Sequence, residues 1–339
     1  MIRRALTPRR IAWIVAALLL LTLAVLYLAP SNDYLLLPDR AHPVAPLVRV
    51  PGGHESAGPG GIYFVDVFER RASLLESLFP FIRSGATLVP ASLIVPPGVS
   101  DRAARLADLR EMRNSERVAA AVALRRLGYR VVLRPAGVLV DAIEIGSHAE
   151  GKLAPADVIV SVDGTPTNTI RQLLGAMSRV RPGAFVTVGI RRGASRLAYR
   201  IRTIADPAQP SRALVGFQPE QAADIRLPID VRIDAGGVGG PSAGLAFALE
   251  VMEKLGRDVD RGYRVAATGQ MELDGTVAAI GGVKQKTFGA REAGADVFLV
   301  PAAGDNAAEA RRYAHGLRII AVQSFPQALR ALATLPPKR

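Results

Sequence analysis

The chain has 339 residues, a net charge of +13, no cysteine and only four histidines. This length suits two or three domains. The absence of cysteine excludes disulfides, thiolate metal sites and a cysteine nucleophile. The histidines, His42, His54, His148 and His315, are scattered, so the sequence predicts no metal site and no cofactor. Arginines are spread along the chain without interleaved aromatics, which gives no indication of nucleic-acid binding.

An uncharged stretch of 19 residues, Ile11–Ala29, lies close to the amino terminus. As a helix it spans roughly 28 Å, which matches a bilayer core of about 30 Å. Four arginines lie within residues 1–10, and no basic cluster follows the stretch closely. The positive-inside rule then predicts a single-pass plasma-membrane anchor over 11–29, with residues 1–10 cytoplasmic and the bulk of the chain extracytoplasmic. A cleaved signal peptide is the alternative, but Tyr27-Leu28-Ala29 is a poor cleavage site.

Residues 30–128 are predicted to form a stalk followed by an α+β region. The first part, 30–61, is rich in proline, glycine and turn formers and is interpreted as an extended stalk. A long amphipathic helix is expected over 100–127, because Ser100 or Asp101 can cap it and Gly128 can end it. Shorter elements are expected at Leu47–Val50 (strand), Ile62–Phe68 (strand) and Ser73–Phe81 (helix).

Residues 129–205 change to short apolar runs broken by glycine, which indicates a β-rich domain. The segment from Gly151-Lys152-Leu153 to Asp163-Gly164-Thr165-Pro166 resembles the core motif of bacterial PDZ domains, although Ala156 replaces the usual glycine before Asp157. That resemblance implies a domain that binds extended peptides by strand addition. It also implies a peptide-binding segment at Gly137, Val138, Leu139 and Val140. The alternative is a β-rich spacer without a ligand.

Residues 206–339 alternate strands and helices, as expected of a mixed α/β domain. They contain Gly240-Pro241-Ser242-Ala243-Gly244 and, further on, Gly281-Gly282-Val283-Lys284-Gln285-Lys286. A serine needs a base to become a nucleophile, and a neutral lysine can serve. Only five lysines occur, and two of them lie in this second segment. A phosphate-binding loop is less suitable, because no Walker motif is present. A G-x-S-x-G nucleophile elbow, as in α/β-hydrolase esterases, needs a later histidine, and only His315 follows.

These two segments also resemble the Lon protease proteolytic domain, together with Ala267-Thr268-Gly269, Ala293-Gly294 and Leu299-Val300-Pro301. The resemblance implies Ser242 as the nucleophile, Lys284 as its general base and Thr268 as a residue that holds the lysine. Supporting positions would be Gly240, Pro241, Gly281 and Gly282. Lys286 is two residues from Lys284, so we expect it to point away from the site and to be solvated. Two departures from ATP-dependent relatives are Gly239, in place of an acid, and Gln270, in place of a glutamate.

The sequence therefore predicts a multi-domain α/β protein with a transmembrane helix, an α+β region, a PDZ-like domain and a Lon-like domain. The functional hypothesis is an ATP-independent, membrane-anchored serine endopeptidase with a Ser–Lys dyad, in which the PDZ domain captures protein or peptide substrates. Lon-type domains form rings, so the resemblance implies a homo-oligomer, such as a hexamer. The alternatives are a non-catalytic, membrane-tethered PDZ adaptor and, more weakly, an esterase.

Overall fold

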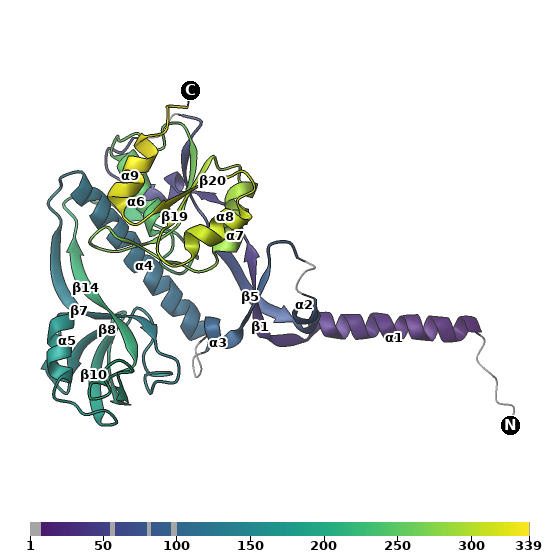
Figure 1. Cartoon of the computed structure of the whole chain (residues 1–339), viewed down its shortest axis with the longest axis horizontal. Helices are drawn as coiled ribbons and strands as arrows, with labels where there is room; N and C mark the ends of the chain where they lie inside the picture. Colours follow the sequence, from purple (N-terminus) through teal and green to yellow (C-terminus); the bar gives the residue numbers. More distant parts are fainter. Residues whose placement is uncertain (1–7, 55–57, 80–82, 96–99, 339) are drawn as a thin grey trace.

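The computed structural model describes residues 8–54, 58–79, 83–95 and 100–338. The predicted basic tail lies partly outside these ranges, as does the end of the helix predicted over Ser73–Phe81. Helix α1 (Pro8–Leu28) projects from the rest of the protein as an isolated rod (Figure 1). Its mean hydropathy is 2.7, and none of its residues is buried. Among the described residues it is the one helix long and apolar enough to cross a membrane.

A small antiparallel sheet links α1 to the body of the protein (Figure 1). Its strand order is β5-β1-β6, and the backbone N–H of Leu74 donates to Ala29 O at 2.9 Å, next to the end of α1. Ser73 forms a capping box with Glu76 at the start of the following helix. The elements of this part are β1 (Pro30–Pro38), β5 (Val67–Ser73), α2 (Leu74–Leu78), β6 (Thr87–Pro90) and α3 (Ala91–Ile94).

The C-terminal body contains a five-stranded sheet with the order β2-β4-β16-β19-β20. The last four strands are parallel, and β2 is antiparallel to β4. A two-stranded pair, β3 with β15, belongs to the same body. The strands are β2 (His42–Pro43), β3 (Val48–Arg49), β4 (Gly61–Phe64), β15 (Arg232–Ile233), β16 (Arg264–Ala267), β19 (Val297–Pro301) and β20 (Arg318–Val322).

This sheet corrects the prediction of a stalk over residues 30–61. Val44 and Val48 are buried in the main core, and His42 and Pro43 form β2, which pairs with β4. The strand predicted over Ile62–Phe68 is present in part as β4, which pairs with β16. Proline and glycine suggested an exposed linker, but the apolar residues between them pack against the C-terminal body. A short 3₁₀ turn, η1 (Ala45–Leu47), leads into β3. The segment before the PDZ-like region is therefore part of the same folded body as the segment after it.

Helix α4 (Asp101–Arg126) matches the long helix predicted over 100–127, with Ser100 as its N-cap. Its second half packs on α6, where the small side chains of Ala119 and Ala123 are fully buried. The remaining elements of the body are α6 (Gly244–Lys254), β17 (Gln270–Met271), β18 (Val277–Ala278), α7 (Val283–Glu292), α8 (Asn306–Tyr313) and α9 (Phe325–Ala333).

The β-rich domain follows α4 in the chain and is inserted between the two halves of the body (Figure 1). Its main sheet has the order β11-β10-β8-β7-β14, with helix α5 packed against it. The strand β14 extends this sheet past residue 205, the predicted end of the domain. The elements are β7 (Val132–Ile143), β8 (Val158–Val162), β9 (Thr165–Pro166), α5 (Ile170–Met177), β10 (Phe185–Arg192), β11 (Ser195–Arg202), β12 (Ile204–Ala205), β13 (Ala213–Leu214) and β14 (Phe217–Arg226).

Candidate active site

Ser242 lies in direct contact with a lysine, and that lysine is Lys286. The Nζ of Lys286 donates a hydrogen bond to Ser242 Oγ at 2.7 Å. Ser242 lies two residues before the first residue of α6, and Lys286 lies in the first turn of α7. Lys286 is buried, whereas Ser242 is half-buried. A partly accessible hydroxyl backed by a buried amine is the arrangement that a Ser–Lys pair requires.

The expectation for Lys284 is corrected by this geometry. The Nζ of Lys284 donates to Ala86 O at 2.8 Å and to Thr87 Oγ1 at 3.3 Å, and it lies 5.6 Å from the ring centre of Tyr313. Successive helical residues are turned by about 100°, so residues two apart point to nearly opposite sides of α7. The two lysines do point to opposite sides of α7, but Lys286 is the one that reaches Ser242. Lys284 therefore bonds to the start of β6 in the small sheet, whereas Lys286 bonds to Ser242.

Burial makes Lys286 a suitable proton acceptor. Because the amine is removed from water, the pKa of Lys286 is lowered to about 8. The carboxylates of Asp66 and Glu69 act in the opposite direction, since negative charge favours the protonated amine. A useful fraction of Lys286 is therefore neutral at neutral to mildly alkaline pH, in contrast to a solvated lysine.

Thr268 holds both partners of the pair. Its Oγ1 donates to Ser242 O at 3.1 Å, and Lys286 Nζ lies 3.5 Å from the same oxygen of Thr268. The backbone N–H of Gly269 also donates to Ser242 O, at 2.7 Å. Thr268 is itself fully buried after β16. The resemblance implied that Thr268 lies beside Lys284, whereas in the structure it lies beside Lys286.

The glycine-rich loop before Ser242 is fixed by helix α4. Gly240 has φ +82°, a conformation that favours glycine, and its N–H donates to Asp108 O at 2.9 Å. Ser115 Oγ donates to Pro241 O at 2.9 Å. A Cβ at Gly239 would lie 2.6 Å from the Cβ of Asp108, so the acid expected there from ATP-dependent relatives has no space. Asp108 of helix α4 occupies the space that a side chain at position 239 would need.

The other predicted glycines lie at the start of α7. Gly282 is the N-cap residue, with φ +68°, and a Cβ on it would approach Val67 Cγ2 to 2.7 Å. Gly281 has open space around its Cα. Gly282 lets the chain turn sharply into α7 beside strand β5, and so helps to set the position of Lys286.

Two families match the chain, in the regions that the fold separates. Residues 211–334 match the Lon protease (S16) C-terminal proteolytic domain, and residues 125–203 match the PDZ domain. The chain carries a PDZ domain and a Lon-type proteolytic domain. Strands β2 to β4 and nearly all of helix α4 lie before both matched regions, yet they complete the Lon-type core.

Several curated relatives are Lon proteases that match only part of the chain. Lon protease 1 of Sorangium cellulosum is 37% identical over 30% of this chain and 13% of its own length. Lon protease 2 of Bacillus subtilis is 32% identical over 36% of this chain and 21% of its own length. The chain therefore spans only about an eighth to a fifth of the length of these two relatives.

Two solved structures each match about a quarter of the chain. The PDZ domain of the SdrC-like protein from Listeria monocytogenes is 19% identical, covers 24% of this chain and 86% of its own, and has a TM-score of 0.23. A solution structure from Geobacillus thermodenitrificans is 25% identical, covers 25% of this chain and 97% of its own, and has the same TM-score.

The predicted peptide-binding segment of the PDZ domain lies inside its sheet. Gly137, Val138, Leu139 and Val140 belong to β7, which has neighbours on both sides: Val138 pairs with Ile159 of β8 and with Gln221 of β14. A strand with two neighbours has no free edge for a peptide, so this expectation is corrected. The outermost strand next to β7 is β14. Sequence reasoning missed this strand because most of its residues, Phe217–Arg226, are polar, charged or small.

Helix α5 lies beside the outer strand β14. The side chain of Gln221 accepts a bond from Ile170 N at 3.2 Å and donates to Asn168 O and Gly137 O, both at 3.0 Å. This side chain fastens the start of α5 to β14 and β7.

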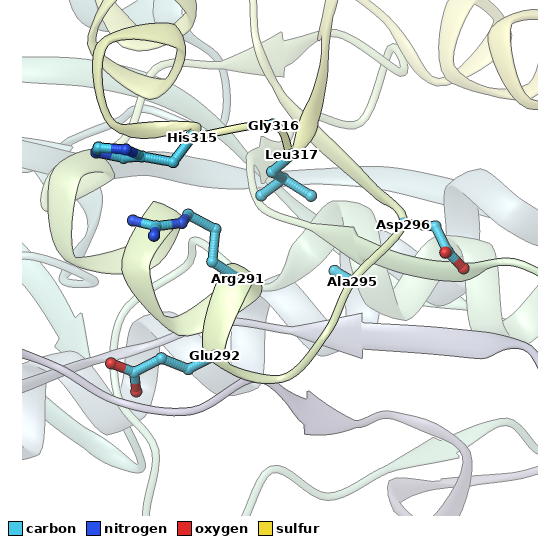
Figure 2. A pocket seen from close by; sticks show the side chains of 7 residues that line it. All are labelled: Arg291, Glu292, Ala295, Asp296, His315, Gly316 and Leu317. Atoms are coloured by element: carbon cyan, nitrogen blue, oxygen red, sulfur yellow. The ribbon is translucent and has the colours of Figure 1, made fainter.

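A separate pocket of the Lon-type domain lies between the end of α7 and the turn before β20 (Figure 2). In Figure 2, His315 and Arg291 lie near each other, while Asp296 lies at the opposite end. Arg291 Nη1 donates to Tyr313 O, and Asp296 pairs with Lys338 at 2.7 Å. His315 is exposed at this pocket. Ser242 is hydrogen-bonded to Lys286 and not to His315, so the structure does not support an esterase in which a histidine is the base. The lining residues are Arg291, Glu292, Ala295, Asp296, His315, Gly316 and Leu317.

Proposed function

We propose that this protein is a serine endopeptidase in which Ser242 is the nucleophile and Lys286 the general base. The observation that carries the proposal is the 2.7 Å hydrogen bond between Lys286 Nζ and Ser242 Oγ in a buried setting. The matched Lon-type domain supports the same reaction class. The protein would cleave peptide bonds through an acyl-enzyme, without ATP.

The chemistry follows from the two groups in contact. Neutral Lys286 takes the Oγ proton as Ser242 attacks the peptide carbonyl carbon, which gives a tetrahedral oxyanion and an ammonium. The C–N bond then breaks as the ammonium returns its proton to the leaving amine. A water molecule, deprotonated by Lys286, attacks the resulting ester, and the acid product leaves as Ser242 regains its proton. Because α6 begins just after Ser242, the positive end of its dipole favours the oxyanion.

The kcat/KM of peptide cleavage should rise with pH up to about pH 8. Burial lowers the pKa of Lys286 to about 8, and only the neutral amine can accept the serine proton. We therefore expect kcat/KM to rise about tenfold per pH unit up to that pKa and then to level off. The measurement is kcat/KM on an unfolded protein or a peptide from about pH 6 to about pH 10. A flat profile across this range would contradict the assignment of the base.

We propose further that the PDZ domain captures substrates along the edge of β14. This rests on the order of its sheet, in which β14 is outermost and adjoins α5. An extended segment added there would run beside the strand that leads directly into the Lon-type domain. Capture and cleavage would then be linked by a short stretch of chain, residues 227–241.

Peptide addition at β14 can be tested by disulfide trapping, because the chain has no native cysteine. Ala223→Cys lies on β14, and Ala198→Cys lies on β11, the opposite edge of the same sheet. We expect a cysteine-containing extended peptide to be trapped at least ~10-fold more by Ala223→Cys, since effective concentration is high only beside a bound peptide. Equal trapping at the two edges, read by mass spectrometry, would refute capture at β14.

Membrane anchoring by α1 is part of the same proposal. The helix is apolar and none of its residues is buried, and Arg9 and Arg10 lie at its beginning. By the positive-inside rule the amino terminus would be cytoplasmic and the catalytic body extracytoplasmic, at the plasma membrane. The sheet β5-β1-β6 would then hold the body next to the bilayer. A homo-oligomer, such as a ring of six, stays a proposal from the Lon resemblance.

The alternative function is a membrane-tethered PDZ adaptor without catalysis. The two functions are separated by incubating the full chain in detergent with an unfolded protein, beside Ser242→Ala. Cleavage by the wild type that is lost in Ser242→Ala supports the peptidase. Peptide binding without cleavage by either form supports the adaptor.

A further inference from the structure

Three metal-ligating side chains converge at the junction between the small sheet and the Lon-type core. Asp39 and His42 lie in and just after the turn from β1 to β2, and Asp66 follows β4. The Nε2 of His42 is 3.6 Å from Asp39 Oδ2 and also 3.6 Å from Asp66 Oδ1. Both distances exceed the 2.7–3.2 Å range of N–H···O hydrogen bonds. His42 therefore lies within ion-pair range of both carboxylates but forms no direct hydrogen bond with either.

The spacing matches the edge of a metal coordination shell. With zinc–nitrogen and zinc–oxygen distances near 2.1 Å, two ligands of a tetrahedral ion lie about 3.4 Å apart. All three ligand atoms lie within 4.8 Å of one another. One imidazole and two carboxylates also form a donor set that divalent transition metals accept.

Two of the ligands are held in place by their surroundings. Asp39 Oδ1 accepts the N–H of Arg40 at 2.8 Å, which leaves Oδ2 directed at His42. The ring of His42 packs on Phe64 with centroids 5.3 Å apart. Outer contacts of this kind commonly orient metal ligands.

The Oδ1 of Asp66 also favours a cation, although the Asp66 side chain as a whole is 24% exposed and this oxygen lies within ion-pair range of His42. The Asp66 Oδ1, the oxygen that faces His42, is shielded from solvent and has no hydrogen-bond partner among the described residues. A shielded carboxylate oxygen without a donor is unfavourable, and a bound cation would offset that cost. The side chains of Asp39 and His42 are 42% and 45% exposed, so one side of the cluster stays open for an ion and a water ligand.

We propose that Asp39, His42 and Asp66 bind one divalent transition-metal ion of the Zn²⁺ class, with water in the open position. The ion would join the β1–β2 turn to the β4–β5 turn. This junction lies directly behind α7, because a Cβ at Gly289 would be only 1.9 Å from Asp39 O. The role is structural: the ion fixes the small sheet against the helix that carries Lys286. The proposal does not depend on peptidase activity.

The test is metal binding by the full chain in detergent after removal of metals with a chelator. We expect Zn²⁺ titration to show one saturable site, measured by calorimetry and by zinc content after dialysis, and an increase in Tm on binding. His42→Ala and the near-isosteric Asp66→Asn should each weaken binding at least ~10-fold. Co²⁺ should give the intense visible absorption of a four-coordinate site in the wild type only.

Two control variants separate this site from other groups. His54→Ala removes a histidine outside the cluster. Asp258→Asn alters a second group of carboxylates in the described chain, which contains no histidine. Both controls should bind Zn²⁺ as the wild type does. Absence of a saturable site in the wild type, or unchanged binding in His42→Ala and Asp66→Asn, would overturn the proposal.

Discussion

Lys286→Met is expected to reduce peptidase activity by ~10³-fold or more, whereas Lys284→Met is expected to change it by less than about tenfold. Methionine keeps the unbranched stem of lysine and removes only the amine. At position 286 that amine is the group bonded to Ser242 Oγ. At position 284 it binds Ala86 O and Thr87 Oγ1, away from the serine. The two variants therefore form a matched pair, two residues apart on one helix.

The measurement is kcat/KM on one unfolded protein or peptide substrate, with Tm as a control for folding. Lys286→Met should not lower Tm greatly, because a buried amine is costly to desolvate and methionine suits an apolar site. Equal loss in both variants would point to a damaged helix rather than a missing base. Loss in Lys284→Met alone would restore the assignment made from the sequence.

Gly289→Ala is expected to destabilise the protein, although alanine in a helix usually stabilises. Gly289 lies within α7, and an alanine Cβ would be 1.9 Å from Asp39 O and 2.9 Å from Val65 Cγ1. The first contact is with backbone, which cannot rotate away. The helix gain of about 1 kcal/mol is therefore outweighed, and we expect a net loss of about 1–3 kcal/mol. Activity should fall as well, because α7 carries Lys286.

Gly175→Ala is the matched control for this prediction. Gly175 lies within helix α5, and a Cβ there would meet no atom within 4 Å. Alanine should then be neutral or stabilising by up to about 1 kcal/mol. Denaturant unfolding of both variants gives the comparison. A Gly289→Ala protein as stable as the wild type would show that α7 and the β1–β2 turn do not pack as closely as described.

The sequence predicted the features that depend on local pattern. The apolar run indicated α1, the capping residue and periodicity indicated α4, and the flanking glycines singled out Ser242. Each of these follows from residues close together in the chain. The choice of Lys286 does not, because Lys284 and Lys286 have nearly the same sequence context. Only the packing of α7 between Ser242 and the small sheet distinguishes them.

Long-range pairing explains the remaining differences. Strand β4 enters the core by pairing with β16, some 200 residues later, and β14 covers β7 from beyond the expected domain end. Proline and glycine before β4 suggested a linker over residues 30–61, and the apolar run Ile62–Phe68 indicated a strand but not its distant partner. His42 likewise meets Asp66 only because β2 pairs with β4. A scattered set of histidines in the sequence therefore did not reveal this cluster.

The central claim is that Lys286 activates Ser242 for acyl transfer. The most direct measurement is mass spectrometry of the full chain after brief reaction with a peptide ester or a serine-directed phosphonate. We expect a covalent adduct on Ser242 in the wild type and in Lys284→Met, and no adduct in Lys286→Met or Ser242→Ala over the same time. An adduct on Ser242 that forms equally fast in Lys286→Met, or one on another residue, would contradict it.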